Sequence, residues 1–338
     1  KKQKEAITHP PAPLMILAGA GTGKTFTLES RIIYLIEKFD VSPNHILGIT
    51  YTEKGANELK SRIVKQIGKQ GETLTINTFH SFCFKILQEH TPLASMQLLE
   101  ESEAIHLFLE RFDELGPFKS DEFAMDPQNA IVSSFIPFFN RMRDELIEIS
   151  NLNIEYNEND GSQEIYNQLV DLKRIYPIFQ KWKRNINVID YGDMILSCYE
   201  LLKSNKKILS LIQRKYRNII IDEFQDNNFA LNEIINLIVG ERNHLTVVGD
   251  DDQVIYSFRG ANMYNIKSFQ NKYKKNSNFK FVTLEKNYRS NQAILDLANS
   301  SIINNRERID KTLKSYLDSN NQKPIRFWGE TKDQLQFL

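Results

Sequence analysis

The chain has 338 residues, of which 41% are hydrophobic and 25% are charged, a composition typical of globular proteins rather than of disordered or fibrous ones. It contains 43 lysine and arginine residues and 43 aspartate and glutamate residues, so its formal net charge is zero. This balance excludes a general basic field, and any nucleic-acid site must be a local patch. No run approaches the roughly 18 apolar residues of a membrane helix, so we expect no membrane partner.

Length and cysteine content bear on the number of domains and on the compartment. The length allows two or three domains with a sizeable core. Cys83 and Cys198 are far apart in the sequence and match no metal-binding or redox spacing. The first residues lead into no apolar signal core. We therefore expect a protein of a reduced, cytoplasmic compartment.

The first predicted element is an apolar strand, residues 14–18, which runs into a glycine-rich turn and then into a helix over residues 26–37. Glycines let backbone N–H groups converge on phosphate oxygens, and the helix N-terminus adds positive potential. In the Gly-Lys-Thr sequence that closes the turn, Lys24 would reach the β- and γ-phosphates and the Thr25 hydroxyl would ligate Mg²⁺. The strict pattern has a glycine where this chain has Ala18. An ordinary strand-to-helix turn is the alternative, which the Gly-Lys-Thr sequence disfavours.

Strands then alternate with helices along the chain. Further buried strands are predicted at residues 46–50, 74–77, 218–222 and 245–249, with helices over residues 55–66 and 78–88. Such alternation indicates an α/β fold with a parallel sheet covered by helices on both faces. Between residues 89 and 189 the alternation disappears. We interpret this stretch as a mostly helical subdomain inserted into the α/β domain.

The pattern toward the C-terminus suggests a second unit. A lysine-rich stretch at residues 271–278 precedes a predicted strand at 281–284, a helix at 291–304 and a strand at 325–328. We place a domain boundary at the lysine-rich stretch. The expected organisation is a first α/β lobe from residues 1–88 and 190–272, an insertion from residues 89–189, and the start of a second lobe from residues 273–338.

An acidic pair follows the strand of three isoleucines at its C-terminal end, where α/β proteins bind ligands. We expect Asp222 to hold Mg²⁺ through water and Glu223 to polarise the water that attacks the γ-phosphate. A solvated acidic strand end is the alternative, which the phosphate loop disfavours.

Two later segments carry side chains suited to the same nucleotide. After the strand at residues 245–249, Gln253 could report whether the γ-phosphate is present, although spacing alone leaves open a solvated acidic turn. Tyr288 could stack on a base, and Arg289 could stabilise charge on the γ-phosphate. Because these two residues lie beyond the expected boundary, the nucleotide would bridge two lobes.

Aromatic residues also occupy the turns after several strands, namely Tyr51, Phe79, His80, Tyr256 and Phe258. Aromatic platforms in a positively lined groove hold single-stranded nucleic acid without sequence preference. The charge could come from the nearby Lys54, Lys60, Arg62, Lys85 and Arg259. For each aromatic taken singly, packing in the core is the favoured alternative.

Together these segments resemble one family, the UvrD/Rep/PcrA-type superfamily 1 DNA helicases. The matching segments occur in the family's order, at residues 3–7, 18–25, 49–56, 78–81, 190–195, 222–226, 249–261 and 284–290. The resemblance implies a RecA-like P-loop NTPase sheet with an inserted, mostly helical subdomain and the start of a second RecA-like lobe. It implies ATP and Mg²⁺ as cofactors, and single-stranded DNA and single/double-strand junctions as partners. The implied activity is ATP hydrolysis coupled to 3′→5′ movement on DNA.

The resemblance also implies roles for individual residues. The nucleotide would contact Gly19, Ala20, Gly21, Thr22, Gly23, Lys24, Thr25 and Phe26. Gln3 would read the adenine edge and Tyr288 would stack on the adenine. Gln253 and Arg289 would contact the γ-phosphate. The DNA path would be lined by Tyr51, Thr52, Thr78, His80, Tyr256 and Phe258, and Arg259 could serve either the DNA or the nucleotide.

This chain departs from the family pattern at several points. Phe26 stands where an arginine near the base is common, and Glu53 replaces an asparagine and would repel DNA phosphates if it faced them. The family's last motifs are absent before Leu338. We therefore expect a fragment with the first motor lobe, its insertion and the opening of the second lobe.

Two functional hypotheses follow. The leading one is an ATP-driven motor on single-stranded DNA. The second is a nucleotide-gated single-stranded DNA-binding module with little hydrolysis or unwinding. A P-loop phosphotransferase acting on small molecules is a third hypothesis, which the Gln253 and Tyr288–Arg289 segments disfavour.

Overall fold

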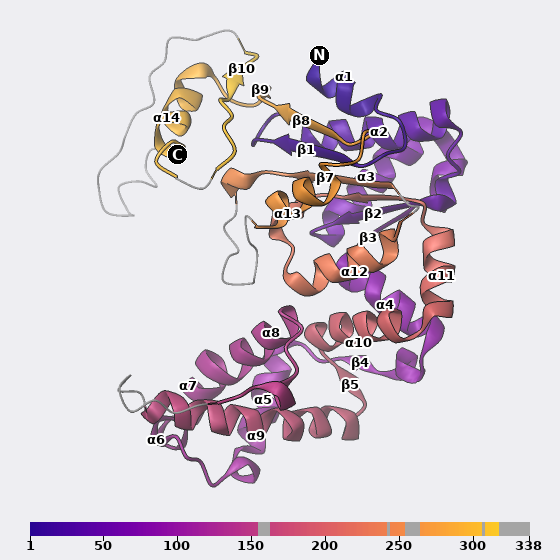
Figure 1. The fold of residues 1–338 in the computed structure, drawn as a ribbon. Helices are drawn as coiled ribbons and strands as arrows, with labels where there is room; N and C mark the ends of the chain where they lie inside the picture. Colours follow the sequence, from indigo (N-terminus) through magenta and orange to yellow (C-terminus); the bar gives the residue numbers. More distant parts are fainter. Residues whose placement is uncertain (155–162, 242–243, 254–263, 306–307, 318–338) are drawn as a thin grey trace.

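The computed structural model describes residues 1–154, 163–241, 244–253, 264–305 and 308–317. Within them, six parallel strands form one sheet (Figure 1). The strands are β1 (Leu14–Ala18), β2 (Ile46–Thr50), β3 (Thr75–Thr78), β6 (Asn218–Ile221), β7 (His244–Gly249) and β8 (Lys280–Leu284). Their order across the sheet is β3-β2-β6-β7-β1-β8. The predicted α/β class is confirmed.

Helices cover both faces of the sheet because the strands are apolar on both faces. Along β1, Leu14 and Ile16 belong to the core on one face and Met15 and Leu17 to the core on the other, and all four are fully buried. The first face is covered by α1 (Lys2–Ile7), α2 (Lys24–Phe39) and α3 (Glu53–Ile67). The opposite face is covered by α4 (Phe79–His90), α10 (Tyr191–Ser204), α11 (Lys206–Lys215), α12 (Phe229–Val239) and α13 (Tyr264–Tyr273). Since all strands are parallel, their carboxyl ends meet at one edge of the sheet.

The edge strand β8 corrects one expectation. We expected residues 273–338 to begin a second lobe, but β8 pairs with β1 from Leu14 opposite Lys280 to Ala18 opposite Leu284. Leu284 is buried in the same core as β1. The domain boundary that we placed before this strand is therefore wrong, because β8 belongs to the sheet of the first lobe. The lysine-rich stretch is a connection within the first lobe, and its polarity reflects the exposure of most of its residues to solvent.

A second, smaller sheet follows β8. β9 (Lys286–Asn287) pairs in parallel with β10 (Lys314–Ser315), and α14 (Gln292–Ile302) lies between them in the sequence. The strand expected at residues 325–328 lies outside the described residues. Among the helices that the structure describes, none is long and apolar enough to cross a membrane.

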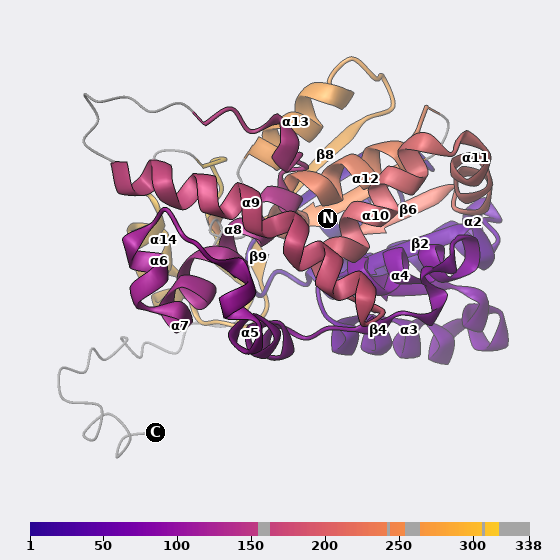
Figure 2. The same ribbon diagram turned by 90° about the horizontal axis from the view of Figure 1, so that it is seen from below.

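The chain leaves the α/β lobe after α4 and returns at α10, and the residues between form a separate helical body (Figures 1 and 2). Its helices are α5 (Glu101–Glu110), α6 (Asp121–Met125), α7 (Pro127–Ala130), α8 (Ile136–Asp144) and α9 (Gln163–Asn185). They pack around aromatic side chains, among which the buried rings of Phe108 and Phe179 stack with centroids 4.3 Å apart. A short parallel pair, β4 (Gln97–Leu98) with β5 (Val188–Ile189), joins the two connecting segments. The predicted helical insertion is confirmed.

A buried ion cluster fixes the insertion to α10. Arg143 of α8 contacts Asp190 at 2.6 Å and Asp193 at 2.7 Å, and Lys183 of α9 contacts the same two carboxylates. Although burial opposes ionisation, Arg143 and Lys183 hold the pKa of Asp190 well below its ordinary value. The space for Arg143 exists because residue 192 is glycine, where an added Cβ would lie 2.6 Å from the guanidinium.

Candidate functional site

The glycine-rich turn between β1 and α2 is shaped by two left-handed residues. Gly21 has φ of 72° and Gly23 has φ of 83°, a region that residues with a Cβ rarely adopt. The buried Thr22 hydroxyl donates to the carbonyl oxygen of Gly19 at 2.7 Å and braces the turn from within. α2 begins at Lys24, so its N-terminal N–H groups face the space in front of the turn.

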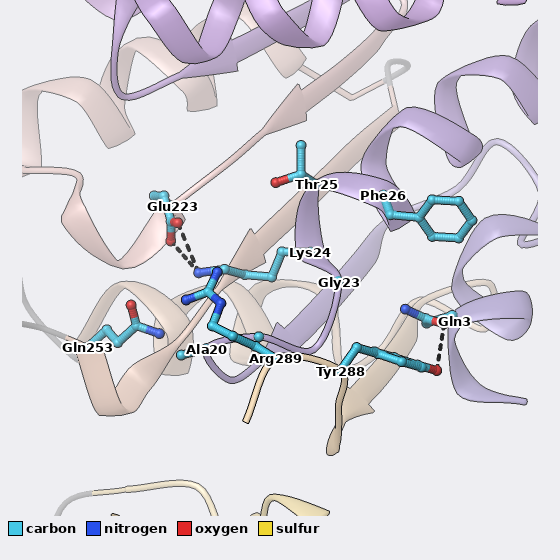
Figure 3. A pocket seen from close by; sticks show the side chains of 11 residues that line it. Gln3, Ala20, Gly23, Lys24, Thr25, Phe26, Glu223, Gln253, Tyr288 and Arg289 are labelled. Carbon is cyan, nitrogen blue, oxygen red and sulfur yellow. Dashed lines mark hydrogen bonds and ion pairs between the residues drawn. The ribbon is translucent and has the colours of Figure 1, made fainter. Parts of the chain in front are cut away.

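A cavity of about 650 Å³ lies in front of this turn (Figure 3). It is lined by Gln3, Ala20, Gly21, Gly23, Lys24, Thr25, Phe26, Glu223, Gln253, Tyr288 and Arg289. The four residues predicted as catalytic, Lys24, Glu223, Gln253 and Arg289, thus share one cavity. Gly19 and Thr22 belong to the turn but do not line the cavity.

Lys24 and Glu223 form an ion pair across the cavity. The Lys24 Nζ donates to Oε2 of Glu223 at 2.7 Å and to Oε1 at 2.9 Å. Glu223 directly follows Asp222 at the end of β6, and its backbone has a left-handed φ of 49° that directs it out of the strand. Arg289 extends toward this pair (Figure 3). A cation suited to phosphate and a carboxylate suited to activating water are therefore in direct contact.

A second cavity of about 450 Å³ adjoins the first and shares Thr25, Glu223 and Gln253 with it. Burial, together with the nearby charge of Glu223, raises the pKa of Asp222 to about 6 and that of Asp226 to about 6. The Oδ1 atom of Asp226 is buried without a hydrogen-bond partner among the described residues. Carboxylates grouped beside a hydroxyl suit a hard divalent cation such as Mg²⁺.

Gln225, to which we assigned no role from the sequence, connects this acidic group to the end of β7. Its side-chain amide donates to Oε2 of Glu223 at 2.9 Å, and its carbonyl oxygen accepts from the backbone N–H of Asp250 at 3.0 Å. Gln253 donates from its own amide to the Asp250 carboxylate. Both glutamines therefore form hydrogen bonds with Asp250. The position of Gln225 inside an otherwise assigned motif was the signal that could have found it.

The opposite end of the cavity is formed by Gln3 and Tyr288. The Gln3 amide donates to the carbonyl oxygen of Thr22 at 3.0 Å, and the Tyr288 hydroxyl donates to Oε1 of Gln3 at 3.2 Å (Figure 3). Tyr288 is 41% exposed, so its ring can accept a stacked base. Phe26 is 57% exposed and its ring turns away from Lys24 (Figure 3).

Asn287, another residue without an assigned role, docks the Tyr288–Arg289 segment on the turn. Its side-chain amide donates to the carbonyl oxygen of Ala20 at 2.7 Å, and its Oδ1 accepts from the backbone N–H of Arg289 at 2.8 Å. The backbone N–H of Tyr288 donates to the carbonyl oxygen of Gly21 at 2.8 Å. Asn287 is 2% exposed. The segment that carries the aromatic ring and the arginine is thus hydrogen-bonded to the glycine-rich turn.

Arg31 on α2 secures the segment that carries Gln3. It is 1% exposed, and burial lowers its pKa to about 10. Its guanidinium donates to the carbonyl oxygens of Ala6, His9 and Pro10 and to the Thr246 hydroxyl. A single arginine in an amphipathic helix gave no indication of this role, which depends on contacts far apart in the sequence.

The family model described as the UvrD/REP helicase N-terminal domain matches residues 1–274. The chain belongs to the UvrD/REP helicase family. It is 33% identical over 342 residues to the ATP-dependent DNA helicase PcrA of Staphylococcus aureus, and 34% identical over 316 residues to the protein of that name from Staphylococcus epidermidis. The alignments cover 100% and 92% of this chain but 44% and 41% of those proteins, so the chain spans less than half their length.

In this UvrD/REP helicase chain, the residues predicted to contact DNA lie beside the second cavity and on α4. Tyr51 is 43% exposed and lines that cavity together with Thr52, whose hydroxyl caps α3. His80 is exposed, and its ring meets that of Tyr191 edge to face with centroids 5.0 Å apart. Phe79 is buried in the core, so its core alternative holds. Tyr256, Phe258 and Arg259 lie outside the described residues.

The carboxylate of Glu53, the first residue of α3, reaches the N-terminal end of α4. The Thr78 hydroxyl donates to Glu53 Oε1 at 2.9 Å, and the Ser81 hydroxyl donates to the same oxygen. Thr78 also caps α4 by accepting from the Ser81 N–H. A helix N-terminus with two hydroxyl groups is suited to an anion. In this chain the anion is an internal carboxylate.

Proposed function

We propose that the chain binds ATP with Mg²⁺ and hydrolyses it to drive 3′→5′ movement on single-stranded DNA, as part of a DNA helicase. The observation that supports this most directly is the cavity shared by Lys24, Glu223, Gln253 and Arg289. They are the types of side chain that transfer of a γ-phosphoryl group to water requires: two cations, a base and an amide. The relatives' name, ATP-dependent DNA helicase, supports the same proposal.

ATP and Mg²⁺ suit the residues present. The left-handed glycines and the start of α2 supply N–H donors for phosphate oxygens, and Tyr288 offers a face for the adenine. Thr25 and Asp222 would hold Mg²⁺, which when bound neutralises part of the phosphate charge. The raised pKa of Asp222 fits this role, because a cation there would relieve the repulsion from Glu223 that disfavours its charged form.

The Lys24–Glu223 pair gives the proposed mechanism its first step. Lys24 is held by the carboxylate that is expected to act as the base, so phosphate oxygens must compete for Lys24. Once Lys24 turns to the phosphates, Glu223 can accept a proton from the attacking water. Gln225 keeps a hydrogen bond to Glu223 and holds its orientation during this exchange. Arg289 extends toward the same place, where it can stabilise the charge that develops.

The proposed DNA partners are single strands and single/double-strand junctions. The exposed Tyr51 and His80 provide aromatic surfaces for bases, and Thr52 provides a polar group beside Tyr51, while the buried Thr78 is bonded to Glu53 and Ser81. Glu53 would weaken the phosphate contacts at the start of α4. A reaction that uses ATP and DNA is also in keeping with the cytoplasmic compartment expected from the sequence.

The second candidate is a nucleotide-gated DNA-binding module with little hydrolysis. The observation that favours it is again the Lys24–Glu223 pair, because a carboxylate that is ion-paired with a lysine is a weaker base toward water. In this case ATP would change DNA affinity without turnover.

The experiment that separates the two candidates is steady-state ATP hydrolysis by the 338-residue chain with and without oligo(dT). The motor proposal predicts hydrolysis that the oligonucleotide stimulates at least tenfold, and loss of this activity in Lys24→Ala. Absence of stimulation, together with ATP-dependent DNA binding, would support the second candidate.

Direction is tested separately. If the stimulated chain moves 3′→5′, a fluorophore on the 5′ end of the oligonucleotide should report its arrival with a delay that grows with oligonucleotide length. A length-dependent delay at the 3′ end instead would contradict the proposed direction.

A further inference from the structure

Three consecutive aspartates at the end of β7 surround one buried lysine from the distal part of the chain. The Lys311 Nζ contacts Asp250 at 3.1 Å, Asp252 at 2.7 Å, and also Asp251. The side chains of Lys311, Asp250 and Asp251 are at most 3% exposed. Although burial opposes its charge, the three carboxylates raise the pKa of Lys311. The ammonium therefore sits charged inside the protein, held by three acids.

The segment that carries Lys311 is attached to this cluster at further points. Arg308 forms two bonds to the Asp252 carboxylate, at 3.1 and 3.2 Å, and the backbone N–H of Ile309 donates to Asp251 at 2.6 Å. Three carboxylates grouped in this way could hold a metal ion. Here the Lys311 ammonium contacts all three and takes the place that such an ion would occupy.

The same segment also touches the glycine-rich turn. Leu313 follows Lys311 by two residues and lies so close to Gly19 that an added Cβ there would be 2.6 Å from a Leu313 methyl group. The segment then pairs as β10 with β9, directly before Tyr288 and Arg289. Residues 308–315 therefore contact the segments that follow β7 and β1, next to the nucleotide cavity, and continue into the small β9–β10 sheet.

The buried cluster is connected to the residues proposed to act on the γ-phosphate. The Asp250 carboxylate contacts Lys311 through Oδ1 and accepts from the Gln253 amide through Oδ2. The Asp250 N–H donates to Gln225, whose amide donates to Glu223. Lys311 thus contacts Asp250 directly, and through this network it is two polar contacts from Gln253 and three from Glu223.

We propose that Lys311 is a positioning residue, which fixes Asp250 and through it the side chains of Gln253 and Gln225, and so links the placement of the small β9–β10 sheet to the nucleotide site. The inference rests on the proposed function for its consequence in hydrolysis. Its physical basis is that a buried carboxylate without its cation must take up a proton or move. Either response changes the group that Gln253 donates to.

The first test is spectroscopic and needs no hydrolysis. Side-chain amide NMR signals of ¹⁵N-glutamine-labelled chain, assigned with Gln253→Glu and Gln225→Glu, are compared between wild type, Lys311→Met and Lys314→Met. Lys314 is an exposed lysine three residues away and serves as the matched control. The Gln253 and Gln225 signals should move in Lys311→Met and stay in place in Lys314→Met. Unchanged signals in a folded Lys311→Met protein would overturn the inference.

The second test separates positioning from overall stability. In Lys311→Met the single-turnover hydrolysis rate should fall at least tenfold while the Kd for a fluorescent ATP analogue stays within about twofold of wild type. If binding and hydrolysis both decrease in proportion to the fraction of unfolded protein, Lys311 has a structural role only. If wild-type chain hydrolyses no ATP, the proposed function fails, and the NMR comparison still decides this inference.

A charge-balanced variant covers the case in which Lys311→Met does not fold. Lys311→Met combined with Asp251→Asn removes one cation and one buried carboxylate, and the asparagine Oδ1 can still accept from Ile309. Asp250 has then lost its cation, so the Gln253 signal should again move. A folded double variant with wild-type glutamine signals would overturn the inference.

Discussion

Replacement of Glu223 by glutamine should abolish ATP hydrolysis and, at the same time, tighten ATP binding. Both carboxylate oxygens of Glu223 accept hydrogen bonds from Lys24. A bound γ-phosphate has to draw Lys24 away from this carboxylate and also approaches its negative charge. A glutamine keeps the shape of the side chain but holds Lys24 through one neutral oxygen and repels no phosphate. The variant therefore loses its base and also loses a competitor for Lys24.

The size of the effect follows from the burial of the pair. The side chains of Lys24 and Glu223 are 13% and 31% exposed, so the pair lies between a surface ion pair and a buried one. We assign it about 1–2 kcal/mol, between the value for exposed pairs and that for hydrogen bonds to charged groups. ATP affinity should then rise about 5- to 30-fold. The rate of hydrolysis should fall by about 10² to 10⁴, the usual contribution of a positioned base.

Affinity is measured by titration with a fluorescent ATP analogue in the presence of Mg²⁺, and hydrolysis by phosphate release in a single turnover. Glu58→Gln is the matched control, because Glu58 lines the neighbouring cavity but pairs with Arg62 instead of Lys24. It should change neither quantity. Retained turnover in Glu223→Gln would show that the base lies elsewhere. Unchanged or weaker ATP binding would refute the competition for Lys24.

Three further changes test other parts of the structure. Glu53→Gln should strengthen binding of a labelled oligo(dT) about two- to fivefold at low salt, since one carboxylate beside the proposed DNA path becomes neutral. Binding is measured by fluorescence anisotropy, and an unchanged binding curve would place Glu53 off that path. Gly192→Ala should lower the free energy of unfolding in urea by about 1–3 kcal/mol, because the new Cβ would lie 2.6 Å from the Arg143 guanidinium, and a variant as stable as wild type would contradict this packing. Burial and the nearby Arg31 lower the pKa of His244, so the folded state binds fewer protons than the unfolded state. The contribution of His244 to the free energy of unfolding should therefore be fully present above about pH 6.5 and fall as the pH decreases below it, by at most about 1.4 kcal/mol per pH unit. In urea titrations at pH 7, 6 and 5, the free energy of unfolding of His244→Asn should decrease less steeply than that of wild type.

The strands of the main sheet could be predicted because their signal is local. A buried parallel strand needs a continuous apolar run, and β2 (Ile46–Thr50) and β6 (Asn218–Ile221) are such runs. The assignment of β8 to a lobe was wrong because it depends on a pairing partner. Nothing within residues 280–284 distinguishes an edge strand beside β1 from the first strand of a new sheet.

The candidate site could be predicted in part for a similar reason. Lys24, Glu223, Gln253 and Arg289 each belong to a short motif with its own chemistry, and all four line one cavity. Which of them touch could not be predicted. Lys24 and Glu223 are 199 residues apart, and they can meet because β1 and β6, which precede them, end at the same edge of the sheet with β7 between them. Lys311 belongs to no motif that we identified in the sequence, and the partners of a single lysine depend on which side chains the fold brings next to it.

What the sequence determined by itself is the phosphate loop and the order of the chemical groups along the chain. Those follow from local preferences: glycine where φ is positive, apolar runs where a strand is buried, and a helix start after the turn. What only the tertiary structure decided is the pairing of these groups. It includes the hold of Glu223 on Lys24, the docking of Asn287 on the turn, and the three aspartates around Lys311. Charge and hydrogen bonding act over a few ångströms in space, whatever the separation along the chain, so their partners are fixed by the fold.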